Sequence, residues 1–406
     1  MTNAARRPGN GVVLVSPYPN QGGPTVAGSG GSALNWYTRA YAAALRGRSW
    51  DVTVVGQRGR DAVWDDRGVR VVSAYDRGSL CVARQIGDAI LREPRAVVHV
   101  QHELFAYGGI ASAFALPSAL RRVRGRGRPV VTTVHGVIQL ERIDRAFVRG
   151  NGILAPPSLV RQAWHALLVQ VARASDVLHV HEAEHATWLR SSYGVTAPIV
   201  VAPIGAEPEA GTPARSAARE RLGLPREARV VLFFGYLLER KGIIPFLGSV
   251  RAMLAADPSL VVIVAGSVPD RVAGTLDIAR TLEQLAAHPR FRAEGFVPDE
   301  RVAELFASSD VLVLPYTFSM SASGPFALAL AHERPVLLSE VFRTSYPDAP
   351  LLFAPTEAGI ATAVARFFAD PPSRVAAERF IATLRAGRSW SAIAERMSAL
   401  YDGLRS

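Results

Sequence analysis

Several residue types and patterns are scarce in this 406-residue chain, and each scarcity excludes a class of protein. Cys81 is the single cysteine, so a disulfide framework, a thiolate zinc site and an iron–sulfur centre are excluded. No apolar run approaches the about 18 residues that a membrane-spanning helix needs, and no apolar stretch resembling a signal peptide follows Met1 to Asn10. We therefore expect a soluble protein of a reducing, cytoplasmic compartment.

Lysine is nearly absent as well. Lys241 is the one lysine among 46 basic residues, and all the others are arginine. The 46 basic and 35 acidic residues give a net charge of +11, which suits an anionic partner, although arginines scattered along alanine-rich helices also follow from a biased genome composition. Because a chain that otherwise uses arginine keeps a compact ammonium at one place, position 241 is a candidate functional site.

The most basic segment, residues 120–129, reads LRRVRGRGRP and follows the apolar run 110–116. We favour a solvated helix end and loop between two strands. The alternative is a basic surface segment that contacts anionic lipid, which would place the protein peripherally at the inner membrane face. Nucleic acid is not an expected partner, because aromatic interleaving, zinc-finger spacing and helix-turn-helix signals are all missing.

Short β-branched runs alternate with longer segments rich in Ala, Leu and Arg along the chain. Continuous apolar strands separated by helices predict parallel sheets covered on both faces. Residues 203–225 are rich in proline, glycine and charge, as linkers are, and they divide the chain into two doubly wound α/β domains. The runs are 12–15, 52–55, 97–100, 130–134, 177–180 and 199–202, followed by 230–234, 261–265 and 311–314.

Ligands of doubly wound sheets bind beyond the carboxyl ends of the strands, so the residues after each run are informative. After the first run, glycines including Gly30 and Gly31 precede a helix expected over 33–45, where backbone amides and the helix dipole favour an anion. The segment lacks a GxGxxG signature and no acidic residue ends the second strand. A nicotinamide-binding Rossmann domain is therefore disfavoured.

Histidines follow two neighbouring strands. His102 comes after the third run, with Glu103 next to it, and His135 ends the segment VTTVHG after the fourth run. Each can be a satisfied structural residue, and the prediction of a role at the crevice is stronger for His135. A second histidine group is interpreted as structural, because two members alternate on a strand and the third lies in the following helix; contact with substrate is the alternative. Its members are His179, His181 and His185.

Two cations mark the start of the second domain. Gly235 ends a strand, and Arg240 and Lys241 follow before the next helix. The pair is either a surface turn with two solvated charges or an electropositive site suited to a diphosphate, and the single lysine favours the second interpretation.

A second anion site is predicted near residue 324. The strand 311–314 is followed by small hydroxyl residues and a helix that begins at Gly324, with Pro325 suited to a first helical position. Ser321, Ser323 and Gly324 offer hydroxyls and free amides at a positive helix end. N-capping by Ser323 is compatible with this role, because capping and anion binding use the same donors.

Taken in order, these motifs resemble a nucleotide-sugar-dependent glycosyltransferase of the GT-B fold, from the retaining family GT4. The segments that carry the resemblance are SALNWYTRAYAAAL, HG, SDVLHVHEAEHATWL, FGYLLERKG, AGS, EGFVPDERVAELFASSDVLVLPY and ALALAHERPVLLS. The resemblance implies two Rossmann-like domains facing across a cleft. Residues 1–207 would form the acceptor-side domain and residues 208–387 the donor-binding domain, with a helix at about 388–406 packing back on the first.

The resemblance also implies roles for single residues. Lys241, with Arg240, would bind the donor diphosphate, and His135 would contact the donor sugar. Backbone at Phe296 and Val297 would hold the nucleotide base. The full set expected at the donor is Gly30, Gly31, Gly235, Phe296, Val297, Ser321, Ser323 and Gly324, and the acceptor side is expected to hold His102 and Glu103.

The sequence departs from the family at three positions. Tyr236 stands where an arginine is frequent, and Met320 and Leu328 stand where the family usually has two glutamates. The resemblance implies retaining transfer of a hexose-type sugar to a hydroxyl of a glycan, a lipid-linked or a small-molecule acceptor, with no metal and no cofactor beyond the nucleotide sugar. A non-catalytic sugar-nucleotide-binding subunit, suggested by the missing glutamates, and an epimerase or phosphorylase of the same fold stay open as alternatives.

Overall fold

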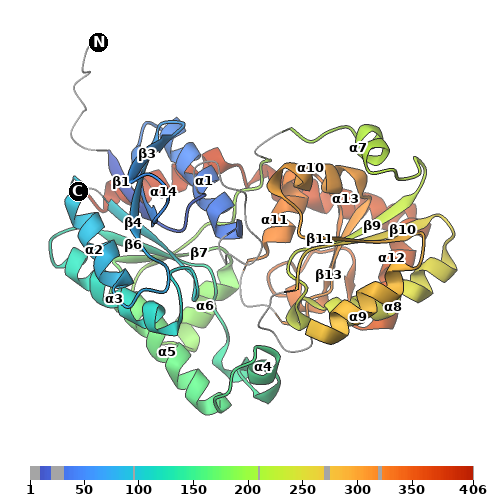
Figure 1. Cartoon of the computed structure of the whole chain (residues 1–406), viewed down its shortest axis with the longest axis horizontal. Helices are drawn as coiled ribbons and strands as arrows, with labels where there is room; N and C mark the ends of the chain where they lie inside the picture. Colours follow the sequence, from blue (N-terminus) through green and yellow to red (C-terminus); the bar gives the residue numbers. More distant parts are fainter. Residues whose placement is uncertain are drawn as a thin grey trace, which may run out of the picture. The chain divides into compact units, whose positions relative to one another are not determined.

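A computed structural model describes residues 10–19, 32–94, 97–208, 211–268, 275–318 and 322–405. The chain splits into two compact units, coloured mainly blue to green and yellow-green to red in Figure 1; the red C-terminal helix belongs to the first unit and the green residues 141–160 to the second. The first unit consists of Met1–Leu140, Arg161–Gly205 and Trp390–Ser406, and the second consists of Glu141–Val160 and Ala206–Ser389.

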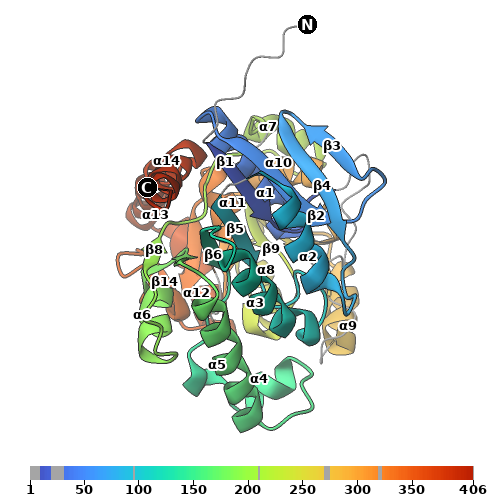
Figure 2. The same cartoon turned by 90° about the vertical axis from the view of Figure 1, so that its left-hand side faces the viewer.

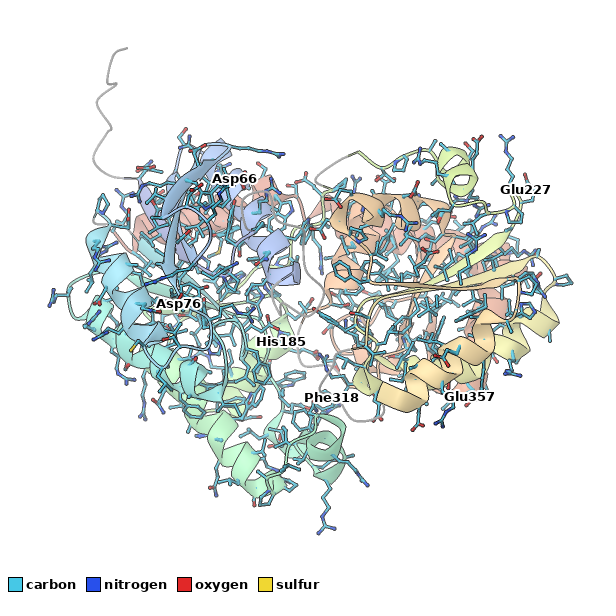
Figure 3. The ribbon with its side chains drawn as sticks, viewed as in Figure 1. Asp66, Asp76, His185, Glu227, Phe318 and Glu357 are labelled. Carbon is cyan, nitrogen blue, oxygen red and sulfur yellow. The ribbon has the colours of Figure 1, made fainter. Side chains whose placement is uncertain are left out.

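One part of this division differs from the domain limits predicted above. Residues 141–160, expected in the first domain, belong to the second unit. The ring of Phe147 in this segment packs against Phe318, labelled in Figure 3, with ring centroids 5.5 Å apart. This long-range aromatic contact is invisible in the local sequence pattern, which explains why residues 1–207 looked continuous.

The first unit contains an eight-stranded sheet in the order β3-β4-β2-β1-β5-β6-β7-β8. Neighbouring strands are parallel except β3 and β4, which pair antiparallel at one edge. Both β5 and β6 are buried along their whole length, as continuous apolar strands covered on two faces should be. The strands are β1 (Gly11–Val15), β2 (Asp51–Gln57), β3 (Val63–Asp66), β4 (Val69–Tyr75), β5 (Val97–His102), β6 (Val130–Val134), β7 (Val177–Val180) and β8 (Ile199–Val201).

Helices cover this sheet on both faces. They are α1 (Ser32–Gly47), α2 (Val82–Arg92), α3 (Ile110–Arg124), α5 (Pro157–Arg173), α6 (Ala183–Ser191) and α14 (Trp390–Gly403), with the short turn η1 (Leu140–Arg142) before α5. The connection β1-α1-β2 and the connection β4-α2-β5 run in opposite directions along the strand order, so right-handed crossovers put α1 and α2 on opposite faces. Helices α2 and α3 lie side by side in Figures 1 and 2.

The C-terminal helix α14 completes the first unit by packing against α1. The hydroxyls of Tyr41 and Tyr401 are 2.6 Å apart and buried. The indole N–H of Trp50 donates to the Ser398 hydroxyl at 2.7 Å. These buried contacts fix residues at the end of the chain to the first strands and helix of the unit.

The second unit contains a six-stranded, fully parallel sheet in the order β11-β10-β9-β12-β13-β14. Successive residues on β9 alternate between two hydrophobic clusters, with Val231 and Phe233 on one face and Leu232 on the other. The strands are β9 (Arg229–Phe234), β10 (Leu260–Ala265), β11 (Phe291–Gly295), β12 (Val311–Leu314), β13 (Val336–Ser339) and β14 (Leu352–Phe353).

The helical elements of the second unit are α4 (Arg145–Gly150), α7 (Arg215–Arg221), α8 (Ile243–Ala256), α9 (Thr275–Ala286), α10 (Asp299–Ser308), α11 (Gly324–Ala331), α12 (Glu357–Ala369) and α13 (Pro371–Ala386), with the short turns η2 (Glu239–Lys241) and η3 (Glu340–Phe342). Within the part of the chain that the structure describes, no helix is both long and apolar enough to cross a bilayer.

Candidate functional site

In the second unit, the carboxyl ends of three strands approach one another through glycine. Gly242 has φ 73°, and a Cβ there would lie 1.8 Å from the Pro315 carbonyl oxygen. Gly266 has φ 150°, and a Cβ there would lie 1.8 Å from the Gly235 carbonyl oxygen. Only glycine fits at either position, so the backbones after β9, β10 and β12 meet without intervening side chains.

Lys241 lies at this meeting point. Its Nζ is 5.6 Å from the ring centroid of Tyr316 and 3.0 Å from the place that a Cβ on Gly235 would occupy. The Cγ of Pro325, in the first turn of α11, is 3.1 Å from the same place. A lysine ammonium and a helix N-terminus therefore converge on one glycine corner. We call Gly235, Lys241, Tyr316 and the first residues of α11 the anion cradle.

The charge state of Lys241 is set by its surroundings. Burial, and secondly the neighbouring positive charge of Arg240, lower the pKa of Lys241 to about 7. No carboxylate among the described residues contributes to this pKa. The ammonium is thus held without an anionic partner from the described chain, and an anion entering the cradle would favour its protonated form.

The N-terminus of α11 presents hydrogen-bond donors beside Lys241. The Ser323 hydroxyl accepts from the Phe326 amide at 3.3 Å, so the N-cap predicted from the sequence is confirmed. The same hydroxyl is 2.9 Å from the Tyr316 hydroxyl. Among the described residues, no heavy atom lies within 4 Å of the place that a Cβ on Gly324 would occupy. An anion can approach the positive end of the helix there.

The loop after β12 is held against the cationic turn η2. The backbone carbonyl of Arg240 accepts from the amides of Thr317 at 3.0 Å and Phe318 at 3.3 Å. These bonds fix the backbone of Arg240, while a role for its side chain in binding an anion stays a prediction.

The other residues predicted at the donor provide less support for a ligand site. Val297 is buried in the core beside β12, and Phe296 is half-buried after the end of β11. Gly30, Gly31, Ser321 and Met320 lie outside the described residues. Leu328 lies on α11 and packs against a hydrophobic cluster, and its side chain has no polar atom that could bind a ligand. The roles proposed for these positions therefore stay predictions.

In the first unit, the two predicted strand-end histidines are neighbours. His102 pairs in register with Val134, and the His135 amide donates to the His102 carbonyl at 3.0 Å. His102 is buried, which lowers its pKa to about 4, and its Nε2 has no hydrogen-bond partner within the described part of the chain. Glu103 beside it is exposed. The acceptor-side roles of both residues stay predictions.

Both ring nitrogens of His135 are engaged inside the first unit. Nδ1 is 3.1 Å from Nε2 of His181, and Nε2 is 2.9 Å from the side-chain oxygen Oε1 of Gln101. The Tyr37 ring packs edge-on against His135 with centroids 5.0 Å apart and planes at 89°. Sequence reasoning missed Gln101 and Tyr37 as partners. A glutamine directly before His102 in the buried strand β5 was the available signal.

The histidines of β7 and α6 are held by contacts inside the first unit. His179 and His181 both bond the Ala202 carbonyl, at 2.9 and 3.1 Å. His185 is buried in α6 (Figure 3), and its burial lowers its pKa to about 4. Across the described ranges, no group of three His, Cys, Asp or Glu side chains is arranged to hold a metal ion.

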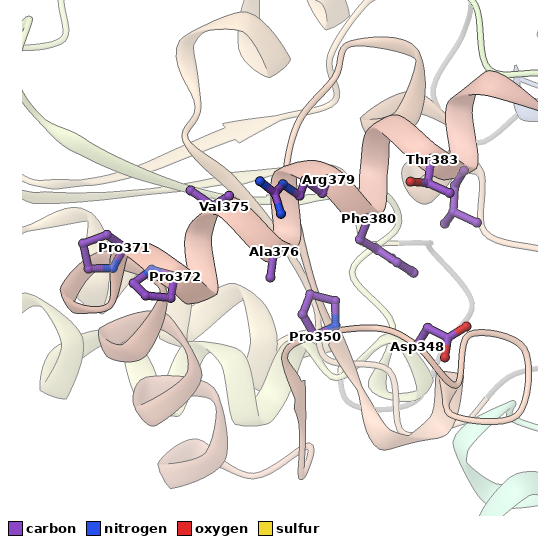
Figure 4. A pocket seen from close by; sticks show the side chains of 10 residues that line it. Asp348, Pro350, Pro371, Pro372, Val375, Ala376, Arg379, Phe380 and Thr383 are labelled. Atoms are coloured by element: carbon purple, nitrogen blue, oxygen red, sulfur yellow. The ribbon is translucent and has the colours of Figure 1, made fainter.

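Most arginines of residues 120–129, for which a solvated helix end and loop was favoured, bond to the protein itself. Arg122 pairs with Asp88, and Arg124 pairs with Asp176 at 2.7 Å. Contact of residues 120–129 with a membrane stays a prediction, and fewer of its charges are free for lipid than the sequence suggested. A separate surface hollow of about 840 Å³ beside α13 is lined mainly by apolar residues such as Phe380 (Figure 4) and contains no residue of the anion cradle.

Two family models match the chain. The model described as "Glycosyltransferase Family 4" matches residues 34–210, and the model described as "Glycosyl transferases group 1" matches residues 228–370. The second matched range includes Gly235, Lys241 and α11, and the first includes His102 and His135.

Curated relatives and solved structures point the same way. The chain is 28% identical over 347 residues to D-inositol 3-phosphate glycosyltransferase 1 of Catenulispora acidiphila, covering 80% of this chain and 77% of the relative. It is 35% identical over 234 residues to D-inositol 3-phosphate glycosyltransferase of Geodermatophilus obscurus, covering 56% and 50%.

Two solved structures share its fold. Sucrose-phosphate synthase from Thermosynechococcus elongatus has TM-score 0.74 and 19% identity, covering 97% of this chain and 99% of that one. HepE of Anabaena, solved in complex with UDP and glucose, has TM-score 0.67 and 13% identity, covering 97% and 100%.

Proposed function

Since this chain is a GT4-like glycosyltransferase with the GT-B fold, we propose that it transfers a hexose-type sugar from a nucleotide-diphosphate sugar to a hydroxyl acceptor, with retention of configuration. The observation that supports this most is the convergence of Lys241 and the N-terminus of α11 on Gly235. A cation and the Gly324 amide at the positive end of a helix, beside one glycine corner, suit a diphosphate leaving group.

The cradle would act mainly on the leaving group. When the bond between the anomeric carbon and the diphosphate oxygen breaks, negative charge builds on the diphosphate, and preorganised donors that face this charge lower the barrier. Lys241, with Arg240 and the amide at Gly324, would supply them. These cations would take the part that a divalent metal plays in other enzymes, so we propose transfer without metal.

The acceptor hydroxyl would attack from the face that the diphosphate leaves. Its oxygen forms the new bond to the anomeric carbon, and its proton passes to a diphosphate oxygen, so no protein base is needed. The protein's remaining task is to hold the two substrates in reacting geometry. We place His135 on the sugar side of this arrangement, with His102 and Glu103 toward the acceptor.

The comparisons favour a donor and an acceptor class. HepE is described in complex with UDP, and the curated relatives act on an inositol phosphate by name. We therefore propose a uridine diphosphate sugar as donor and a phosphorylated polyol as the first acceptor to test. A net charge of +11 is consistent with two anionic substrates.

A donor and acceptor panel tests this proposal. Purified protein is incubated with UDP-, GDP- and ADP-sugars, with and without inositol phosphate or other polyols, and products are identified by mass spectrometry. Nucleoside diphosphate release that requires acceptor, with a retained anomeric configuration by NMR, is the expected result. Donor conversion without acceptor would instead indicate an epimerase, and donor binding with no turnover on any acceptor would indicate a binding subunit.

A further inference from the structure

A chain of hydrogen bonds runs across the interior of the first unit, from His99 to Gln101. His135 is the residue before Gln101 in this chain. His99 Nε2 is 2.6 Å from the Thr133 hydroxyl, which is 2.8 Å from His179 Nδ1. His179 and His181 then meet at the Ala202 carbonyl. His181 continues to His135, and His135 to Gln101. The three histidines before His135 are at most 2% exposed.

The Ala202 carbonyl determines where the protons lie. A carbonyl oxygen only accepts, so His181 must donate to it from Nδ1 at 3.1 Å. A neutral imidazole carries one ring proton, which leaves a lone pair on Nε2 of His181. Burial lowers the pKa of His181 well below its usual value and, with the charges of His179 and His102 as smaller causes, lowers that of His135 to about 3. Both rings are therefore neutral at pH 7.

The neutral state of His181 fixes that of His135. The lone pair on His181 Nε2 needs a donor, and His135 Nδ1 at 3.1 Å must carry the proton that it accepts. His135 Nε2 then holds a lone pair 2.9 Å from the side-chain oxygen Oε1 of Gln101. Two acceptors cannot form a hydrogen bond, so we infer that the amide is turned by 180° and that its N–H group faces the ring. Gln101 is fully buried and its amide nitrogen has no hydrogen-bond partner among the described residues, so the turn breaks no bond of that nitrogen.

We propose that His181 and Gln101 lock His135 in the Nδ1–H tautomer and in a single ring orientation, and that His181 is thereby a positioning residue of the sugar site. With both nitrogens bonded inside the unit, the ring neither donates to substrate nor takes a proton from it. Its contribution is position: the two bonds and the edge-on Tyr37 ring hold His135 in place before substrate arrives. The kinetic part of this inference rests on the proposed function, and the tautomer does not.

Nitrogen NMR of protein labelled with ¹⁵N-histidine tests the lock directly at pH 7. His135, assigned by comparison with His135→Gln, is expected to show a protonated Nδ1 and an unprotonated Nε2. A matched pair of variants sharpens the test. His181→Gln can still accept from His135 at the former Nε2 position, whereas His181→Asn reaches only the former Nδ1 position and loses the acceptor. His135 should keep its tautomer in the first variant and lose it in the second.

Steady-state kinetics of the same pair test the positioning role. Misplacement of a group at the reacting centre by about 1 Å typically costs about 10²-fold in rate, so His181→Asn should lower kcat by about 10- to 100-fold while donor KM changes less than threefold. His181→Gln should stay within threefold of wild type in kcat. A wild-type spectrum with the proton on Nε2 of His135 overturns the lock. Equal kcat losses in the two variants, or losses that follow the melting temperature alone, overturn the positioning role.

Failure of the proposed function would look different. If no donor and acceptor pair gives turnover with the wild-type protein, the enzyme proposal fails. The tautomer of His135 and its response to the two His181 variants can still be read from the spectra, and the lock stands or falls on them.

Discussion

The two sheets of this protein have the same doubly wound plan, but their interiors differ in chemistry. Strands β9, β10 and β12 read RVVLFF, LVVIVA and VLVL, and beyond the first residue of β9 they carry apolar side chains only. Strands β5, β6 and β7 read VVHVQH, VVTTV and VLHV, and their histidine, glutamine and threonine side chains are buried. The second unit keeps its polar groups at the strand ends, whereas the first extends them into its core.

Because of this difference, a substitution at the site of the second unit should change activity without changing stability, whereas a substitution among the polar residues of the first unit should change both. Lys241 lies above a dry core, so its removal takes a charge from the cradle and leaves the packing below unchanged. Thr133 and its histidine partners are part of the core itself, and any change there also disturbs folding. Substitutions at equivalent depth should therefore have different signatures in the two units.

The largest expected effect is the loss of turnover in Lys241→Ala. A preorganised charge at a leaving group typically contributes about 10² to 10³ in rate, so kcat should fall on that order. The melting temperature should not fall, because a buried ammonium without a carboxylate partner is replaced by an apolar group. Rate assays beside thermal unfolding measure both quantities. Activity within threefold of wild type would remove Lys241 from the site.

A reciprocal exchange of threonine and valine tests the contrast between the cores. Thr133→Val should destabilise the protein by about 1–3 kcal/mol, since its hydroxyl bridges His99 and His179 and two buried nitrogens would lose a partner. Val313→Thr in β12 buries a new hydroxyl among apolar neighbours, and it should also lower the free energy of unfolding by about 1–3 kcal/mol. Denaturant unfolding gives both values. An unchanged or more stable Thr133→Val would mean that the polar core contributes nothing to folding.

The pH dependence of nucleotide binding is the next effect in size. With its pKa lowered to about 7, Lys241 is charged below pH 7 and increasingly neutral above it. A diphosphate binds the charged form, so UDP affinity should fall by up to about tenfold per pH unit above pH 7, with proton uptake on binding.

Calorimetry in buffers of different ionisation enthalpy measures this. Lys241→Arg is the matched control: its guanidinium stays charged, so its UDP affinity should be flat from pH 7 to 9, even where the different shape of the cation weakens binding. A pH profile shared by the wild type and this variant would assign the dependence to another group.

The smallest effect concerns the contact between α14 and α1. Ser398→Ala removes the hydroxyl that accepts from the Trp50 indole and should cost about 0.5–1.5 kcal/mol. Because α14 belongs to the first unit, amide hydrogen exchange should quicken in peptides from α1 and β2 and stay unchanged in those from β9 and β10. Equal acceleration in both sets would show that the two units unfold together.

The sequence predicted much of the fold because buried parallel strands are written as continuous apolar runs. The predicted runs 130–134, 177–180 and 311–314 coincide with β6, β7 and β12. Strands β3, β4, β11, β13 and β14 were missed. In the edge strands β3 and β11, and in β4 beside β3, polar residues alternate with apolar ones and part of each strand meets solvent. Strands β13 and β14 are short, at four and two residues.

The site was predictable only where local chemistry stands out. A single lysine after a strand-end glycine was sufficient to select Lys241. The partners of His135 were not predictable, because Gln101, His181 and Ala202 come from separate segments that meet only in the folded unit. The histidine group of β7 and α6 was interpreted as structural; His179 and His181 both bond the Ala202 carbonyl, and we propose that His181 in addition positions His135.

The return of α14 to the first unit also sets an order of events during synthesis. All of the second unit, Glu141–Val160 and Ala206–Ser389, leaves the ribosome before residue 390, whereas the first unit lacks Tyr401 and Ser398 until the last turns of the chain are made. Domains usually fold in the order in which they are translated. Here the unit that is begun first is completed after the other, and until residues 398 and 401 are synthesised the side chains of Tyr41 and Trp50 lack the partners that they have in the folded unit.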